Sequence, residues 1–161
     1  MIARLLALCA LSAGLAAPAR AMTPDTDHQI LLGVLQSHGV NVVINDTRCQ
    51  QGTMLGWTNG STIGLCSDRE PSFQSFQNTI RHEAIHVAQR CLAIAAPHTD
   101  DDDDGFAVLY PAGQLRFWDR WGDTIRHYYD EADWPVEAEA FGFSHKLGAL
   151  EIIRLVNTAC S

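Results

Sequence analysis

Arg81-His82-Glu83-Ala84-Ile85-His86 stands near the middle of the chain and forms a His-Glu-x-x-His motif. On an α-helix, positions i and i+4 lie about 40° apart around the axis, so His82 and His86 share one face and can hold a single metal ion. Glu83 lies about 100° from His82 around the helix axis. From there its carboxylate is better placed to reach a water bound to the ion than to bind the ion itself. The stretch therefore predicts a helix that carries two metal ligands and a general base.

The flanking sequence favours a helix through the motif. Ser72 directly follows Pro71 and is a typical N-cap. We expect the helix to run to about Leu92, because Pro97 cannot continue it. Apolar residues recur through this stretch at mostly helical spacing: Phe73, Phe76, Ile80, Ile85 and Val87. The alternative is an ordinary core helix in which two histidines and a glutamate fall into the pattern by chance.

Residues 1–21 have the features of a secretory signal peptide. Arg4 supplies the positive charge, an apolar run follows, and Ala19-Arg20-Ala21 is a small-x-small cleavage site. The alternative is an uncleaved signal anchor. The sequence thus predicts a single mature domain over 22–161, periplasmic or secreted.

The charge of the mature chain excludes some partners. Removing Arg4 and Arg20 from the 11 basic residues leaves 9 against 19 acidic ones, a formal net charge of −10. Nucleic acid and anionic membranes would repel such a chain. We expect a monomer that acts on a peptide or protein substrate, with no nucleic-acid partner and no membrane contact after signal cleavage.

Four cysteines remain in the mature chain, an even number that is typical of a disulfide framework in an exported protein. Of the three possible pairings we favour Cys49 with Cys66, which bracket a predicted hairpin, and Cys91 with Cys160. Zinc ligation by these cysteines is the less favoured alternative, because no C-x-x-C pair is present.

The first half of the chain predicts one helix and an antiparallel hairpin. Thr23-Pro24-Asp25 opens a helix that ends near Gly39, and 40–44 is rich enough in β-branched residues for a strand. Segments 53–58 and 61–66 flank Asn59-Gly60, a strong two-residue turn signal. If 62–65 were an open edge beside the metal, an extended peptide could bind there by strand addition.

The second half predicts mostly helix. A short strand is expected at 106–110, a helix at 112–130, and a last helix from Pro135 to near Cys160. The fold class is therefore α+β, with a small antiparallel hairpin or sheet before the motif helix and a helical C-terminal half. The acidic run 100–104 is read as a solvated loop, with calcium binding as the alternative.

A catalytic zinc site needs a third protein ligand, because two histidines leave it incomplete. Leu92 stands where the extended HExxHxxGxxH pattern needs a histidine, so that pattern is excluded. Glu137 and Glu139 stand out, because an unpaired carboxylate on an apolar helix would be costly. The downstream candidates are His98, Asp119, Asp123, His127, Glu137, Glu139 and His145.

At these residues the chain resembles the glutamate zincins, a superfamily of HExxH zinc metallopeptidases, and in particular their compact secreted members. The resemblance covers the motif and 134–141, about twenty residues in all. Several of these families have an E-x-x-A arrangement at the zinc glutamate, which implies Glu137 as third ligand, whereas those with alanine directly after the glutamate imply Glu139. Phe141 stands where an aspartate is usual, which implies that Glu139 is the partner of a ligand histidine.

The resemblance also implies an oxyanion donor. Some compact members carry a tyrosine about seven residues before the zinc glutamate, which places Tyr129 first, with Tyr128 and His127 as alternatives. Any of these aromatic residues at helical spacing could instead be part of the core.

These residues predict an exported zinc metalloendopeptidase, with Zn²⁺ held by His82, His86 and Glu137 and with Glu83 as general base. Tyr129 would stabilise the oxyanion. The alternative is a non-catalytic binding or inhibitory module stapled by zinc or by disulfides, or a disulfide-stapled interaction domain without metal.

Overall fold

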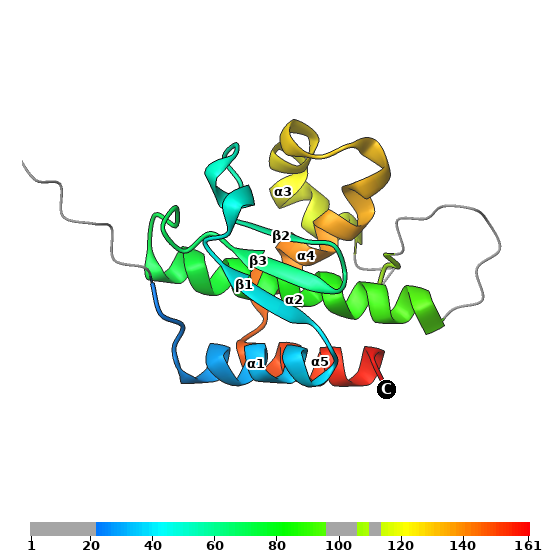
Figure 1. Cartoon of the computed structure of the whole chain (residues 1–161). Coiled ribbons are helices and arrows are strands. Elements are labelled where there is room, and N and C mark those ends of the chain that lie inside the picture. The colour runs from blue at the N-terminus through cyan, green and yellow to red at the C-terminus, as the bar shows by residue number, and fades with distance from the viewer. Residues whose placement is uncertain (1–21, 96–105, 110–113) are drawn as a thin grey trace, which may run out of the picture.

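The computed structural model describes residues 22–95, 106–109 and 114–161, and the side chains of 114–116 are not included (Figure 1). The predicted signal peptide, His98 and the acidic run 100–104 lie outside the described residues. In the described part of the chain, five α-helices accompany one three-stranded sheet, which confirms the α+β class. The helices are α1 (Thr26–Ser37), α2 (Phe73–Ala95), α3 (Gln114–Tyr128), α4 (Trp134–Lys146) and α5 (Ala149–Ala159). The other elements are β1 (Asn41–Ile44), β2 (Gly56–Thr58), β3 (Thr62–Leu65) and the 3₁₀-helices η1 (Thr47–Gln50) and η3 (Glu131–Asp133).

The sheet contains the predicted hairpin, but its order is β1-β3-β2. β2 pairs antiparallel with β3 across the Asn59-Gly60 turn, where Gly60 has φ +81° and Asn59 Oδ1 accepts a hydrogen bond from Thr62 N. β1 pairs parallel with β3, so the sheet is mixed. The expectation that 62–65 is an open edge is wrong, because β1 and β2 occupy both edges of β3.

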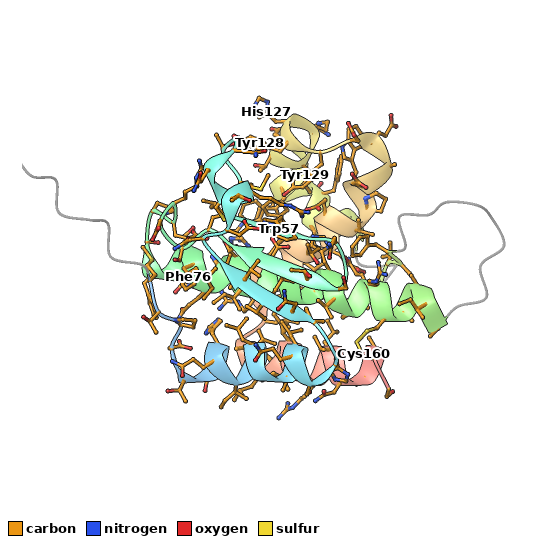
Figure 2. The ribbon with its side chains drawn as sticks, in the orientation of Figure 1. Trp57, Phe76, His127, Tyr128, Tyr129 and Cys160 are labelled. Carbon is orange, nitrogen blue, oxygen red and sulfur yellow. A yellow bond between two sulfur atoms is a disulfide. The ribbon has the colours of Figure 1, made fainter. Side chains whose placement is uncertain are left out.

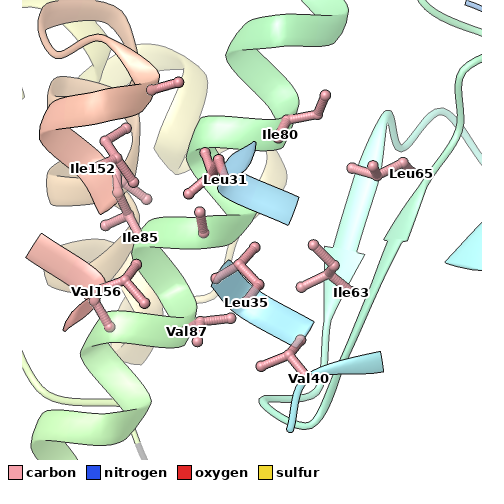
Figure 3. Packing of buried hydrophobic residues seen from close by; sticks show 14 of the residues in the cluster. Leu31, Leu35, Val40, Ile63, Leu65, Ile80, Ile85, Val87, Ile152 and Val156 are labelled. Carbon is pink, nitrogen blue, oxygen red and sulfur yellow. The ribbon is translucent and has the colours of Figure 1, made fainter. Parts of the chain in front are cut away.

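Helix α2 lies behind the sheet and contacts most of the molecule (Figure 1). α1 and α5 pack together on one side of it, and α3 packs on α4 on the other. The core forms where α1, α2, α5 and the inner face of the sheet meet (Figure 3). Its largest fully buried aliphatic side chains include Leu31, Leu35, Ile63, Leu65, Ile80, Ile85 and Ile152.

The motif helix begins where the sequence predicts. Ser72 Oγ accepts a hydrogen bond from Ser75 N, the arrangement of an N-cap, and the helix runs to Ala95, three residues beyond the expected end. Helix α1 begins at Thr26 with Asp25 as its N-cap, slightly later than predicted. Asp25 takes this role because its carboxylate accepts a hydrogen bond from His28 N.

Arg81 fixes the motif helix to its neighbours. It is only 7% exposed, its Nε donates to Ser144 O of α4 at 2.7 Å, and its NH1 lies 2.8 Å from His28 Nε2 of α1. His28 Nδ1 in turn lies 2.7 Å from Asp25 Oδ1. One buried guanidinium thus joins three helices directly beside the motif.

Both predicted disulfides are present. Cys49–Cys66 joins η1 to the end of β3, and Cys91–Cys160 joins α2 to the C-terminus. Two disulfides are compatible with an extracellular or periplasmic protein. None of the described helices has the length and apolar composition needed to cross a bilayer.

Two expectations about the second half are wrong. Residues 106–109 form no strand; this segment is held instead by a hydrogen bond from Ala107 N to Gln89 O. The last helix is two helices, because Leu147 is extended and Gly148 is the N-cap of α5. The carboxylate of Glu151 accepts a hydrogen bond from Gly148 N, which stabilises the new start.

Candidate metal centre

Three side chains from two helices meet at one point. His82 and His86 project from α2, and Glu137 lies in the first turn of α4. The two histidine Nε2 atoms lie 3.1 Å apart. Each lies 3.3 Å from one oxygen of the Glu137 carboxylate. These ligand atoms all fall within 4.8 Å of one another, so the group could hold a metal ion.

The Glu137 carboxylate fits a bound cation. Its Oε2 is buried and, although 3.3 Å from His82 Nε2, makes no hydrogen bond. An unpaired buried carboxylate oxygen is costly unless a positive charge lies against it. Two imidazoles and a carboxylate around one point are a typical donor set for a divalent transition metal.

The charges of His82, His86 and Glu137 also favour a cation bound between them. Burial alone would raise the pKa of Glu137, but its close contacts and charge interactions with His82 and His86 outweigh burial and lower that pKa to about 2. Burial would lower the pKa of His86, but Glu137 raises it to about 9. The carboxylate therefore stays ionised and attracts one positive charge, a proton or a metal ion, into the space between the imidazoles.

Glu83 lies beside this group, under the edge strand β2. It is 5% exposed, and its Oε1 approaches Gly56 closely. Burial raises its pKa, with the negative charge of Glu137 adding to the effect and the two histidines opposing it. The structure thus brings the predicted base to the predicted ligands.

Gln89 is a residue of the candidate site that the sequence interpretation missed. It is fully buried, and its Oε1 accepts a hydrogen bond from His86 Nδ1 at 2.7 Å. Its Nε2 donates to Val136 O and to Glu139 Oε2, both at 3.0 Å, and two such acceptors fix the orientation of the amide. His86 then carries its proton on Nδ1 and presents the Nε2 lone pair to a metal. In the sequence, the only signal for this role of Gln89 was its position three residues after His86, on the same face of the helix.

Glu139 lies one step further from the histidines. Besides Gln89 Nε2, its Oε2 accepts a hydrogen bond from Leu109 N at 2.8 Å. Thus Glu137 joins the histidines, whereas Glu139 is linked to His86 through Gln89. Glu139 also holds segment 106–109 in place, where Phe106 packs edge-on against His86 with ring centroids 5.6 Å apart.

Tyr129 is the tyrosine that reaches the site. Burial raises its pKa, and the charges of Glu137 and Glu83 and a hydrogen bond with Glu137 raise it further. Tyr128 is 65% exposed, and His127 packs against the Tyr128 ring at the outer end of α3 (Figure 2). Of the three predicted donors, only Tyr129 lies beside the candidate ligands.

The remaining candidate ligands in the described residues lie elsewhere. Asp119 is exposed, Asp123 pairs with Arg126, and His145 packs on Trp121 with ring centroids 4.4 Å apart. Phe141, at the position where an aspartate was expected, packs edge-on against His82 at 4.8 Å. An aromatic ring thus orients this histidine where a carboxylate would otherwise do so.

Comparisons of the chain with protein families, with curated proteins and with solved structures found no match.

Proposed function

We propose that the protein is an exported zinc metalloendopeptidase of the glutamate-zincin type. The observation that carries the proposal is the convergence of His82, His86 and Glu137 with the buried carboxylate of Glu83 directly alongside. Two histidines and one carboxylate are the ligand set of a hydrolytic zinc site with an open position. Among the described residues this is the one group of three or more His, Cys, Asp or Glu side chains that could hold a metal ion, and it includes no fourth such side chain.

Zn²⁺ at this site would lower the pKa of a water and polarise a peptide carbonyl. Glu83 takes the proton of the attacking water and passes it to the leaving amine. The Tyr129 hydroxyl, already beside Glu137, donates a hydrogen bond to the developing oxyanion. Gln89 keeps His86 in the tautomer that ligation needs.

The substrate is a polypeptide in extended conformation. Strand addition was expected at 62–65, but β3 is the central strand, and the edge strand nearest the ligands is β2. A peptide paired with the outer edge of β2, which no described strand covers, would lie next to Glu83. Backbone hydrogen bonds would hold it with little dependence on its side chains.

The first experiment measures zinc per chain after gentle dialysis, for wild type, for Glu137→Ala and for Glu131→Ala. Glu131 is an exposed carboxylate six residues earlier and serves as the matched control. We expect one zinc in wild type and in Glu131→Ala, and weakened or lost zinc in Glu137→Ala. Equal zinc in all three would refute the assignment of Glu137.

The second experiment separates a peptidase from a non-catalytic zinc-stapled module. Zinc-loaded wild type and Glu83→Gln are incubated with a quenched-fluorescence peptide library. We expect wild type to cleave peptides and Glu83→Gln to bind zinc normally but lose at least about 100-fold in kcat. Zinc binding without cleavage by wild type would favour the binding or inhibitory module.

A further inference from the structure

Gly56 on the edge strand β2 lies against the carboxylate of Glu83. A Cβ added to Gly56 would stand 2.5 Å from Glu83 Oε1 and 2.6 Å from Thr79 Cγ2. Real Cβ atoms essentially never come so close to other atoms, so any side chain here would displace its neighbours. The inner face of the edge strand and the predicted base therefore occupy adjoining space.

The backbone conformation does not require glycine at this position. The described glycines with positive φ are Gly39, Gly52 and Gly60, and Gly56 is not among them. Gly56 is the first residue of β2, and a glycine in a strand often marks a close approach by another group. At Gly56 that group is the Glu83 side chain together with the Thr79 methyl.

We propose that Gly56 is a positioning residue for the general base: its missing side chain leaves the space in which the Glu83 carboxylate lies beside His82, His86 and Glu137. The proposal rests on the proposed function only in assigning proton transfer to that carboxylate. The close approach of Glu83 to Gly56 does not depend on whether the protein is a peptidase.

Alanine at position 56 would displace the carboxylate more readily than the strand. Oε1 is the end of a flexible side chain, whereas β2 is fixed by its pairing with β3 and by a hydrogen bond from Cys66 N to Leu55 O at 2.8 Å. Zinc ligation does not use Glu83 and should persist. Because a misplacement of about 1 Å costs about 100-fold in rate, the chemical step should fall far more than zinc binding.

The kinetic test compares wild type with Gly56→Ala and two control variants. Gly33→Ala adds a methyl group where no atom lies within 4 Å. Gly64→Ala disturbs the same sheet, but against the Trp57 indole. We expect Gly56→Ala to lose about 100-fold in kcat with unchanged KM and zinc content, and both controls to keep the wild-type kcat. Wild-type kcat in Gly56→Ala, or an equal loss in Gly64→Ala, would overturn the proposal.

A stability cycle tests the same relation without any activity. Urea midpoints are measured for Gly56→Ala in the wild-type, Glu83→Ala and Thr79→Ser backgrounds. We expect Gly56→Ala to lower the midpoint in wild type and to lower it much less once the Glu83 carboxylate is removed. If only Thr79→Ser relieves the loss, or the Gly56→Ala/Glu83→Ala protein does not fold, the glycine serves packing and the proposal fails.

The two experiments separate this proposal from the proposed function. A wild type that binds zinc but cleaves no peptide refutes the peptidase assignment, and the stability cycle still decides whether Gly56 makes room for Glu83. An active wild type with an active Gly56→Ala variant refutes the role of Gly56 alone.

Discussion

Gln89 makes three hydrogen bonds with a single amide, and each constrains the candidate metal ligands or the helix that carries one of them. It accepts from His86 and donates to the backbone and a side chain of α4, the helix that supplies Glu137. Gln89→Ala should weaken zinc affinity by about 10–100-fold, because such partners orient the ligand and fix its tautomer. Chelator competition measures the change. Gln74→Ala, at an exposed glutamine of the same helix, is the control, and equal affinities for the two variants would contradict the role of Gln89.

The pKa values of the candidate ligands predict how zinc binding at the proposed site should depend on pH. Glu137, with a pKa of about 2, stays ionised, whereas His86, with a pKa of about 9, holds a proton that zinc must displace. Affinity should therefore rise about tenfold per pH unit from pH 7 and level off near pH 9, since one proton is released per zinc below that pKa. Calorimetry in buffers of different ionisation enthalpy counts the protons. Zinc affinity that is flat between pH 7 and 8.5 would contradict this reading.

At the scale of elements, the position of α2 depends on Arg81. Its guanidinium is buried among α1, α2 and α4 and bonds to Ser144 O and His28. Arg81→Ala removes the partner of Ser144 O and of His28 Nε2 and should lower the free energy of unfolding by about 2–4 kcal/mol. Urea denaturation measures the loss. Arg154→Ala, at an exposed arginine of α5, should change stability by less than about 0.5 kcal/mol, and an equally small effect of Arg81→Ala would show that the three-helix junction is not needed.

For the whole molecule, the two disulfides should differ in their contribution. Cys91–Cys160 spans 69 residues and Cys49–Cys66 spans 17. Loop-closure entropy gives about 4.5 kcal/mol for the longer span and about 3 kcal/mol for the shorter. Replacing the pairs by alanine, one pair at a time, should thus cost more at Cys91 and Cys160 in urea unfolding. The reverse order would indicate that local packing around η1, rather than chain entropy, dominates.

The sequence determined the features that depend on neighbouring residues. The helical period alone places His82 and His86 on one face, Ser72 caps the helix with its own hydroxyl, and Asn59-Gly60 turns the hairpin. The α+β class and both disulfide pairings also followed from local pattern and cysteine count. In each case the stabilising contact lies within a few residues or has few alternatives.

Only the tertiary structure decided the rest, because those contacts join residues that meet after folding. The parallel pairing of β1 put β3 in the middle of the sheet, and extended Leu147 followed by the N-cap Gly148 divided the last helix where periodicity continued. The choice of Glu137 over Glu139 depended on how α4 packs against α2. The approach of Glu83 to Gly56 depended on where the edge strand crosses that helix. Periodicity reports which face of an element is apolar, but only packing sets which side chains of two faces come within bonding distance.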